Sequence, residues 1–390
     1  MIRITKRPKH EENSGMIRYT SIRRCRQELH PQHSFAPAAA REALAFHRTL
    51  PGYAPTPLAD LKGLAGHLGL KGLFVKDESA RFGLNSFKSL GGSFAMQKLL
   101  SEGPAWQTFV TATDGNHGRG VAWAARTLGQ KAVVFLPRGT AQERLDNILR
   151  LGAQAEITEY EYDDCVRLAL AMSRENGWTL IQDTAWEGYE RIPALIMQGY
   201  TTMGLEIAEQ LSGVRPTHIF LQAGVGSMAG ALTGFFAGLY QDEKPVITIV
   251  EPDGAACFYE SSRAADGQRH FVRDMHTIMA GLCCGEPSTL AWDIVRRLAD
   301  HTIACPDRTA ADGMRILGSP LPGDARIISG ESGAVTAGAV CELMTEESCR
   351  DIREQIGLKS DSVVLCISTE GDTDRQNYRD IVWYGKHGKA

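Results

Sequence analysis

Short apolar runs alternate with longer amphipathic stretches between residues 108 and 182. The runs are rich in β-branched residues and predict strands, whereas the longer stretches repeat apolar residues about every 3.6 positions and predict helices. Strands that alternate with helices in this way are typical of a parallel sheet with helical crossovers. The strands are expected at 108–112, 131–136, 154–158 and 179–182, and the helices at 118–128, 142–149 and 162–176.

The same alternation precedes this region and resumes after it, beyond a long stretch of helical periodicity at 194–211. Before it, helices are expected at 38–49, 61–68 and 93–100, a strand at 73–76, and an extended, proline-containing segment at 53–58. After it, strands are expected at 218–222, 246–250, 326–329 and 362–368, helices at 229–240, 291–298 and 335–344, and an irregular stretch at 253–282. The pattern predicts an α/β fold of two lobes, with an active site between them.

Composition and charge narrow the class of protein. The 390 residues are 43% hydrophobic and 23% charged, which is ordinary for a globular protein with a large core. The net charge of -4 gives no sign of a nucleic-acid or membrane partner, and no apolar run reaches the roughly 18 residues of a spanning helix. Residues 1–20 are basic and polar, so we expect a flexible tail there rather than a secretory signal.

Nine cysteines are scattered along the chain without any CxxC pair. This usage favours a reducing cytoplasm and mostly buried free thiols. Cys283 and Cys284 are adjacent, and the sequence leaves open a disulfide from Cys257 to either of them.

Lys88 stands between a predicted strand and a predicted helix, at the end of the segment GLNSFK. A lysine held among small residues loses part of its hydration, which disfavours the ammonium form and frees the amine to attack an aldehyde. That reactivity is the chemistry of a Schiff base with pyridoxal 5'-phosphate (PLP). Considered alone, Lys88 is better explained as an exposed lysine after a turn, because most lysines are exposed. Three later segments change that interpretation.

The segment TATDGNHGRG, residues 111–120, joins a predicted strand to the start of a predicted helix. Backbone N–H groups at such a helix start bind anions, for example a carboxylate. Asn116 could donate to a phenolic or carboxylate oxygen, whereas Asp114 would repel an anionic substrate. Asp114 is equally well explained as the N-cap of the helix.

A glycine-rich segment at 222–230 follows a predicted strand and opens another predicted helix. Glycines permit close approach and unusual φ angles, and the helix start favours an anion such as a phosphate. The phosphate would lie against Gly224, Val225, Gly226, Ser227 and Met228. The segment also matches the GxGxxA fingerprint of dinucleotide binding, with Glu251 at the end of the next strand as a ribose ligand. A single such motif is weak evidence, so we favour the phosphate over NAD.

Two further loops carry polar residues just after predicted strands. Ser368 ends the strand in LCISTEGDTD, and a hydroxyl that faces a pyridine nitrogen leaves this nitrogen largely unprotonated, which favours elimination chemistry. Asp183, in QDTAWEGY, could hold a substrate ammonium group at the end of its strand. Considered alone, each loop is better explained as a solvated polar turn.

Together, the four segments resemble the fold-type II PLP enzymes of the tryptophan synthase β family. Members share a Ser-Phe-Lys Schiff-base lysine, a Gly-Asn-His-Gly segment, a glycine-rich phosphate loop and a late hydroxyl at the pyridine nitrogen. The corresponding positions here are Lys88, 115–118, 224–228 and Ser368, and the resemblance covers about residues 53–384. Serine and threonine dehydratases carry a small residue at the position of Asp114, whereas the strings KDESARFGLNSFK and STEGDTD are similar to the diaminopropionate ammonia-lyases.

The resemblance implies a two-lobed α/β fold with parallel-rich sheets flanked by helices. A large PLP-binding domain would comprise residues 21–91 and 185–390, and a small domain would comprise residues 92–184. The implied reaction is the α,β-elimination of D- and L-2,3-diaminopropionate to pyruvate and two ammonia. The implied setting is a cytoplasmic homodimer that acts on a small amino acid.

The resemblance also implies roles for single residues. Lys88 would remove the α-proton of one enantiomer and Asp114 that of the other, with Asp183 in a supporting catalytic role. Substrate contacts would come from Ser86, Thr113, Asp114 and Asp183. Cofactor contacts would come from Lys88, Asn116, Gly224, Val225, Gly226, Ser227, Met228 and Ser368, and no metal is expected.

Three alternatives stay open. The first is another PLP eliminase, such as a serine or threonine dehydratase, against which Asp114 speaks. The second is an NAD-dependent oxidoreductase, which would use Gly224 and Glu251 and would leave Lys88 unexplained. The third is a PLP-fold protein that has lost catalysis and serves as a binding module.

Overall fold

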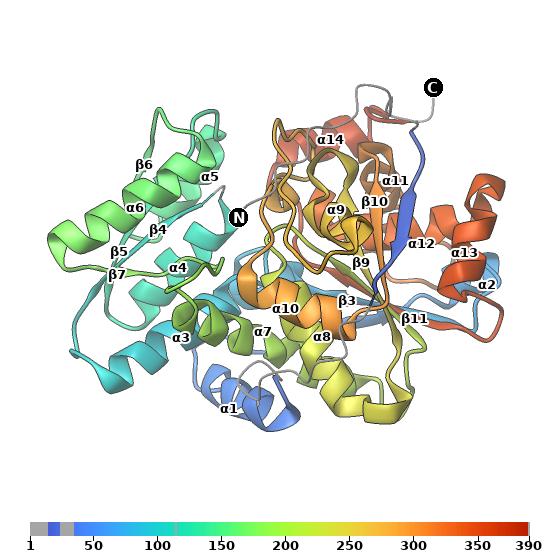
Figure 1. Ribbon diagram of the computed structural model, residues 1–390, viewed down its shortest axis with the longest axis horizontal. Coiled ribbons are helices and arrows are strands. Elements are labelled where there is room, and N and C mark those ends of the chain that lie inside the picture. The colour runs from blue at the N-terminus through green and yellow to red at the C-terminus, as the bar shows by residue number, and fades with distance from the viewer. Residues whose placement is uncertain (1–14, 24–34, 114, 389–390) are drawn as a thin grey trace.

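The strands gather into two sheets on opposite sides of the molecule (Figure 1). The computed structural model describes residues 15–23, 35–113 and 115–388. In this part of the chain, one sheet has seven strands and the other has four. Helices cover both sheets, which is the layered arrangement of α/β folds. No helix among the described residues combines the length and apolar character that a bilayer span requires.

The larger sheet runs through the right half of Figure 1. Its strands are β1 (Arg18–Ser21), β2 (Leu58–Asp60), β3 (Gly72–Asp77), β8 (His218–Gln222), β9 (Val246–Pro252), β10 (His301–Cys305) and β11 (Val363–Ser368). They follow the order β1-β10-β9-β8-β11-β3-β2. The inner strands are parallel, and the edge strands β1 and β2 pair antiparallel with β10 and β3. Strands β8 and β11 are buried along their whole length, because helices cover both faces of the sheet.

The smaller sheet is entirely parallel, with the order β6-β5-β4-β7. Its strands are β4 (Thr108–Ala112), β5 (Lys131–Leu136), β6 (Gln154–Ile157) and β7 (Thr179–Leu180). The crossover helices between them are α4 (Asn116–Thr127), α5 (Gln142–Leu149) and α6 (Tyr162–Asn176). Since all four strands point the same way, their C-terminal ends meet at one edge of the sheet.

The other helices pack on the larger sheet and between the two sheets. They are α1 (Pro37–His47), α2 (Lys62–His67), α3 (Ser89–Glu102), α7 (Arg191–Gln210), α8 (Ser227–Tyr240), α9 (Cys257–Ala264), α10 (Thr289–Leu298), α11 (Asp307–Gly318), α12 (Glu331–Thr345), α13 (Arg350–Ile356) and α14 (Arg375–Val382). Helix α3 contacts both α4 and α7, so it joins the helical layers of the two sheets.

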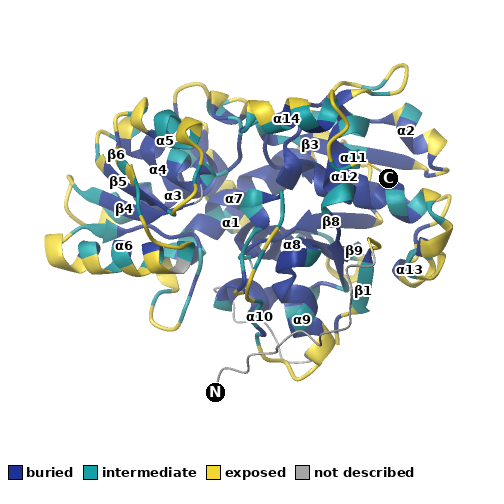
Figure 2. Ribbon diagram, turned by 90° about the horizontal axis from the view of Figure 1, so that it is seen from above, coloured by how far each residue is buried: buried dark blue, intermediate teal, exposed yellow. Residues whose placement is uncertain are grey.

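Side chains of β8 alternate between two apolar clusters, one on each face of the larger sheet. Ile219 and Leu221 belong to the cluster that includes α7, α8 and α10, whereas Phe220 belongs to the cluster that includes α11 and α12. This alternation is the two-residue period of a strand. Figure 2 shows the result: the central strands are dark blue and the outer loops are yellow.

Most of the predicted elements are confirmed, several of them with the expected bounds, such as β4, β5, β8 and α6. The strand expected at 326–329 is wrong. Residues 326–329 are irregular, and the Ile327 N–H, which a strand ladder would use, donates instead to Leu317 O at the end of α11. The irregular stretch expected at 253–282 contains α9, and neither β10 nor α11 was predicted.

The structure describes only part of the expected N-terminal tail, and it does not test the expected domain boundaries. Residues 1–14 lie outside the described part of the chain, whereas Arg18–Ser21 form strand β1 and therefore belong to the larger sheet. The expected division into residues 21–91 with 185–390, and 92–184, stays a prediction. Helix α3 crosses the expected boundary at residue 91.

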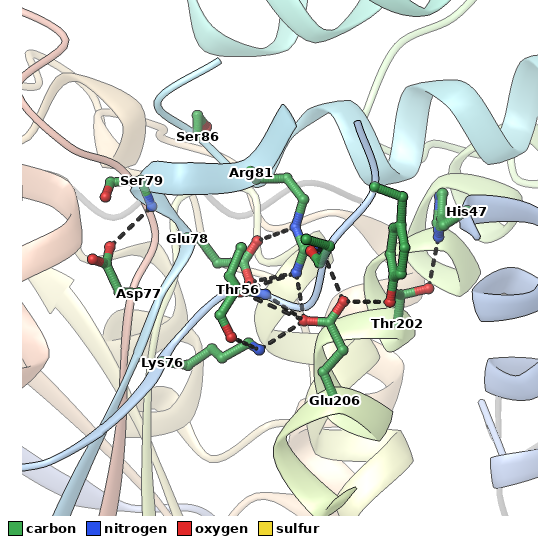
Figure 3. Close-up of polar contacts among 12 residues, drawn as sticks. His47, Thr56, Lys76, Asp77, Glu78, Ser79, Arg81, Ser86, Thr202 and Glu206 are labelled. Atoms are coloured by element: carbon green, nitrogen blue, oxygen red, sulfur yellow. Dashed lines mark hydrogen bonds and ion pairs between the residues drawn. The ribbon is translucent and has the colours of Figure 1, made fainter. Parts of the chain in front are cut away.

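Four charged side chains form a buried ion cluster beside β3: Lys76, Glu78, Arg81 and Glu206 (Figure 3). Glu206 Oε2 on α7 lies 2.7 Å from both Lys76 Nζ and Arg81 Nη2, and Arg81 Nη2 lies 2.8 Å from Glu78 Oε1. Each of the four side chains is at most 1% exposed. The two positive and two negative charges balance, so the cluster joins β3 to α7 without leaving an unpaired buried charge.

The backbone between the ion cluster and Lys88 is strained. Phe82 and Asn85 have φ angles of 50° and 58°, although neither is a glycine. Such a φ is an outlier for a bulky residue like phenylalanine and costs free energy unless its surroundings hold it. The Phe82 ring packs on Trp123 of α4, with 4.4 Å between the ring centroids. This contact fixes the turn that leads to Lys88.

Candidate active site

A pocket of about 400 Å³ opens at the C-terminal ends of strands from both sheets. This edge is where ligands bind in parallel α/β folds. The pocket brings together every described site residue that the sequence predicted except Ser368. These residues are Ser86, Lys88, Thr113, Asn116, Asp183, Gly224, Val225, Gly226, Ser227 and Met228. Asp114 lies outside the described residues.

The amine of Lys88 forms an ion pair with Asp183 inside the pocket. Lys88 Nζ lies 2.5 Å from Asp183 Oδ2, and His117 Nδ1 lies 3.7 Å from the same oxygen. Burial would raise the pKa of the Asp183 carboxyl, but the charges of His117 and Lys88, with the Lys88 hydrogen bond, lower it to about 2. Asp183 is therefore ionised at neutral pH, and its negative charge holds the amine of Lys88 in place.

His117 lies between Asp183 and the backbone of Ile181. Its Nε2 lies 2.8 Å from the main-chain oxygen of Ile181. Because a carbonyl oxygen only accepts, Nε2 must carry a proton, and Nδ1 is the nitrogen that faces Asp183. The predicted Gly-Asn-His-Gly segment thus contributes to the site through His117 as well as Asn116, a role that the sequence analysis did not assign.

Helix α4 begins at the pocket with an unusual backbone. Gly115 has a φ of 147°, a value that favours glycine, and Thr113 Oγ1 accepts hydrogen bonds from the N–H groups of Gly115 and Gly118. The Thr113 side chain therefore takes the place of a helix cap. Asn116, the first residue of α4, lies in the pocket and donates from Nδ2 to Glu370 Oε2 at 2.5 Å.

The glycine-rich loop after β8 forms a cradle for an anion. Gly226 has a φ of 88°, and a Cβ atom there would lie 2.2 Å from Phe258 Cζ. A Cβ atom at Gly224 would lie 3.0 Å from Gly281 O. The loop ends at Ser227, where the 14-residue helix α8 begins and directs its free N–H groups toward the pocket.

Glu251, the acid of the dinucleotide alternative, is occupied elsewhere. Its carboxylate accepts hydrogen bonds from the N–H groups of Phe258 at 2.8 Å and Tyr259 at 2.7 Å, at the start of α9. The side chain is fully buried, and burial raises the pKa of its carboxyl to about 8. Glu251 is thus a helix cap that cannot reach a ribose.

Cys257, which the sequence left open as a disulfide partner of Cys283 or Cys284, carries a free thiol in this structure. Cys283 and Cys284 line the pocket, and Cys257 is buried beside Gly224. Burial raises the pKa of the Cys257 thiol, which keeps it protonated.

Ser368, the last residue of β11, is not among the residues that line the pocket. Its Oγ donates to Ser329 Oγ at 2.8 Å, its side chain is fully buried, and the next two residues, Thr369 and Glu370, line the pocket instead. Side chains of consecutive strand residues point to opposite faces, which explains why Ser368 and Thr369 diverge. The role of Ser368 at a pyridine nitrogen stays a prediction.

Residues 49–370 match the family model described as pyridoxal-phosphate dependent enzyme. The chain belongs to this family. The PLP enzyme is 49% identical to diaminopropionate ammonia-lyase of Escherichia coli (strain K12), over 91% of this chain and 94% of that protein. It is 50% identical to diaminopropionate ammonia-lyase of Salmonella typhimurium (strain LT2), over 88% and 92% of the two chains.

Solved structures agree with the sequence comparison. The crystal structure of the E. coli lyase in complex with an aminoacrylate–PLP azomethine intermediate has a TM-score of 0.92 and 48% identity, and covers 97% of this chain and 99% of that one. A threonine deaminase from Solanum lycopersicum, at 22% identity and a TM-score of 0.73, shows the fold alone. These comparisons confirm the resemblance, the fold class and PLP as cofactor of this enzyme.

The pocket of the PLP enzyme fits its cofactor. The cradle at Gly224 and Gly226 leaves no room for side chains, and α8 presents N–H groups to a phosphate. Among the described residues, the buried Oε1 of Gln222 has no hydrogen-bond partner, and Gln222 lines the pocket. A buried acceptor without a donor is costly, and a bound ligand would supply what it lacks. The sequence analysis did not single out Gln222 or Glu370.

Replacing Gly226 with alanine is expected to raise the dissociation constant of PLP at least about 10-fold, because the Cβ strains the backbone and displaces Phe258. Titration of the visible absorbance with PLP measures this constant. Gly213→Ala is the matched control, since Gly213 has a similar φ of 91° but open space around its Cβ position. Unchanged PLP affinity in Gly226→Ala would contradict the cradle.

Proposed function

We propose that the protein converts 2,3-diaminopropionate and one water into pyruvate and two ammonia. Elimination of the β-amine releases the first ammonia, and hydrolysis of the resulting aminoacrylate releases the second together with pyruvate. The proposal depends on one observation: the amine of Lys88 lies beside Asp183, in the same pocket as the glycine-rich loop 224–228. Nearly half of the residues are identical to relatives that are named for this substrate.

Residues from both sheets would hold PLP. Lys88 would bind it through the amine, the loop 224–228 through backbone N–H groups, and Asn116 and Ser368 through side chains. When bound, PLP supplies an electron sink for the α-carbon of the substrate, which no side chain provides. Ser86 and Thr113, at the pocket wall, would contact the substrate, and the free N–H groups near the start of α4 suit its carboxylate.

Two bases would remove the α-proton, one for each enantiomer of the substrate. The amine of Lys88 is held by Asp183 and would remove the α-proton from one face of the substrate. Asp114 would remove it from the opposite face, which explains a carboxylate where dehydratases carry a small residue. The negative charges of Asp114 and Asp183 would also attract the ammonium groups of the substrate, and a β-amine must be protonated to leave as ammonia.

Asp114→Asn is expected to lower pyruvate release from D-2,3-diaminopropionate at least about 10²-fold, with a much smaller loss for the L form. The measurement is pyruvate formation from each enantiomer by wild type and variant, with PLP supplied. Asp242→Asn serves as a control, because Asp242 lies exposed after α8. Equal losses for both enantiomers would contradict the two-base proposal. Turnover of serine or threonine in place of either enantiomer would contradict the proposed substrate.

The setting and domain roles belong to the same proposal. Two copies would associate, and the enzyme would work in the cytoplasm on a free amino acid. Residues 21–91 and 185–390 would form the PLP-binding domain, and residues 92–184 the small domain. Light scattering of the purified protein measures the number of copies; a monomeric mass would contradict the dimer.

A further inference from the structure

Glu370 is anchored to the loop that carries Lys88. Its backbone forms an isolated antiparallel bridge with Ser86, two residues before Lys88. On either side of this bridge, Phe87 N–H donates to Thr369 O at 3.2 Å, and Gly371 N–H donates to Asn85 O at 3.1 Å. Any shift of the lysine loop therefore carries Glu370 with it.

The side chain of Glu370 reaches away from this loop to two helices. Its Oε2 accepts from Asn116 Nδ2 at 2.5 Å, and its Oε1 accepts from the Ser332 N–H at 3.2 Å. Asn116 opens α4, which belongs to the smaller sheet, whereas Ser332 lies in the first turn of α12, which packs on the larger sheet. One carboxylate thus joins the lysine loop to a helix start from each sheet.

This contact decides how the Asn116 amide is turned. An asparagine amide has a donor end and an acceptor end of nearly equal shape, and only its partners fix which end points where. Because the Glu370 carboxylate accepts only, Nδ2 must face it, and the remaining amide atoms are left for the pocket. The bond is charge-assisted, and such bonds are stronger than neutral ones.

The protein keeps this charge at a cost. Glu370 is 5% exposed, and the neighbouring Glu331 is equally buried. Burial, and then the charge of Glu370, raise the pKa of the Glu331 carboxyl to about 7. A helix cap alone does not require a buried carboxylate, since a serine or threonine hydroxyl would cap α12 without charge.

We propose that Glu370 is a positioning residue. Its carboxylate orients the Asn116 amide toward the pocket, and its backbone fixes the position of Asn116 relative to the loop of Lys88. The inference rests on the proposed function, in which Asn116 binds PLP. Glu370 is not one of the predicted cofactor ligands. The inference predicts that Glu370 affects cofactor binding only through its hydrogen bond to Asn116.

Glu370→Gln is expected to raise the dissociation constant of PLP about 10-fold, the size of one lost hydrogen bond to a charged group. Asn116 and Ser332 donate to different oxygens of Glu370, and glutamine replaces one of these oxygens with an NH₂ group that only donates, so one of the two bonds is lost. The visible absorbance of the lysine-bound cofactor measures the affinity and also reports a changed contact to the ring. Glu370→Asp, one methylene shorter, keeps the charge but not the reach, and the same loss is expected.

The decisive comparison is the double variant with Asn116→Ala. If Glu370 acts through Asn116, the double variant binds PLP no more weakly than Asn116→Ala alone. If the double variant binds PLP about 10-fold more weakly than Asn116→Ala alone, Glu370 acts independently of Asn116 and the inference is overturned. Wild-type affinity in both Glu370 variants overturns it as well.

Glu331→Gln is the matched control, because Glu331 is a buried carboxylate next to Ser332 in the first turn of α12 and accepts a hydrogen bond from Asn377 rather than from Asn116. Its PLP affinity and absorbance are expected to remain those of wild type. Equal effects of Glu331→Gln and Glu370→Gln would assign the result to α12 and overturn the inference. Failure of the wild type itself to bind PLP on Lys88 or to release pyruvate would instead contradict the proposed function.

Discussion

Lys88→Ala is expected to lower pyruvate release from 2,3-diaminopropionate by about 10⁴-fold or more. The structure places this amine in the pocket, within 2.5 Å of Asp183, where the carboxylate keeps it oriented toward the same space as the cradle of α8. Under the proposed function, alanine removes both the nucleophile that would hold PLP covalently and a group that would transfer a proton, and the latter alone contributes about 10²–10⁴-fold.

Two measurements accompany this rate. Borohydride reduction followed by mass spectrometry is expected to place the cofactor on the peptide that contains Lys88 in wild type, and to find no adduct in the variant. Lys98→Ala is the control, because Lys98 lies on the neighbouring helix α3 and pairs with Glu42 at the surface. A cofactor adduct that persists at another lysine in Lys88→Ala would contradict the assignment.

Glu206→Ala is expected to lower the free energy of unfolding by about 3–5 kcal/mol. Glu206 accepts hydrogen bonds from both cations of the buried ion cluster, so its loss leaves Lys76 and Arg81 with Glu78 as the single remaining carboxylate. Urea-induced unfolding measures the change. Glu209→Ala, on the same helix, removes an exposed carboxylate 3.7 Å from Arg48 and is expected to cost less than about 1 kcal/mol.

The ion cluster also predicts a dependence on pH. Burial opposes ionisation of Glu206, but its bonds and charge interactions with Arg81 and Lys76 prevail and hold the pKa of its carboxyl well below the usual range. Because the folded pKa is depressed, the stabilisation is present above the unfolded pKa of about 4.3 and is lost as the pH falls below it. Wild type should therefore lose stability in acid more steeply than Glu206→Ala.

The parts of the site that the sequence predicted are local. The loop 224–228 and the start of α4 are each a strand end, a glycine and a helix start within a few residues, so their chemistry can be recognised without knowing their neighbours. The same locality explains why β4, β5 and α6 were placed correctly from periodicity alone.

What the sequence did not predict depends on distant partners. Glu370 meets Asn116 across 254 positions, and Lys76 meets Glu206 across 130, distances at which no pattern in one chain indicates contact. Glu251 was misleading for the same reason, since the fingerprint places an acid correctly but does not show that α9 binds it.

The order of the strands has a consequence for the growing chain. The smaller sheet is contiguous, from Thr108 to Leu180, and can close as soon as that stretch has left the ribosome. Strand β3, which leads to the lysine loop, must wait for β11 to be synthesised, since its register pairs Gly72 with Val363. Until then the loop before Lys88 lacks its backbone hydrogen bonds to Thr369 and Gly371, so we expect an unfinished polypeptide to have an incomplete cofactor pocket. We therefore expect the pocket to be completed only near the end of biosynthesis.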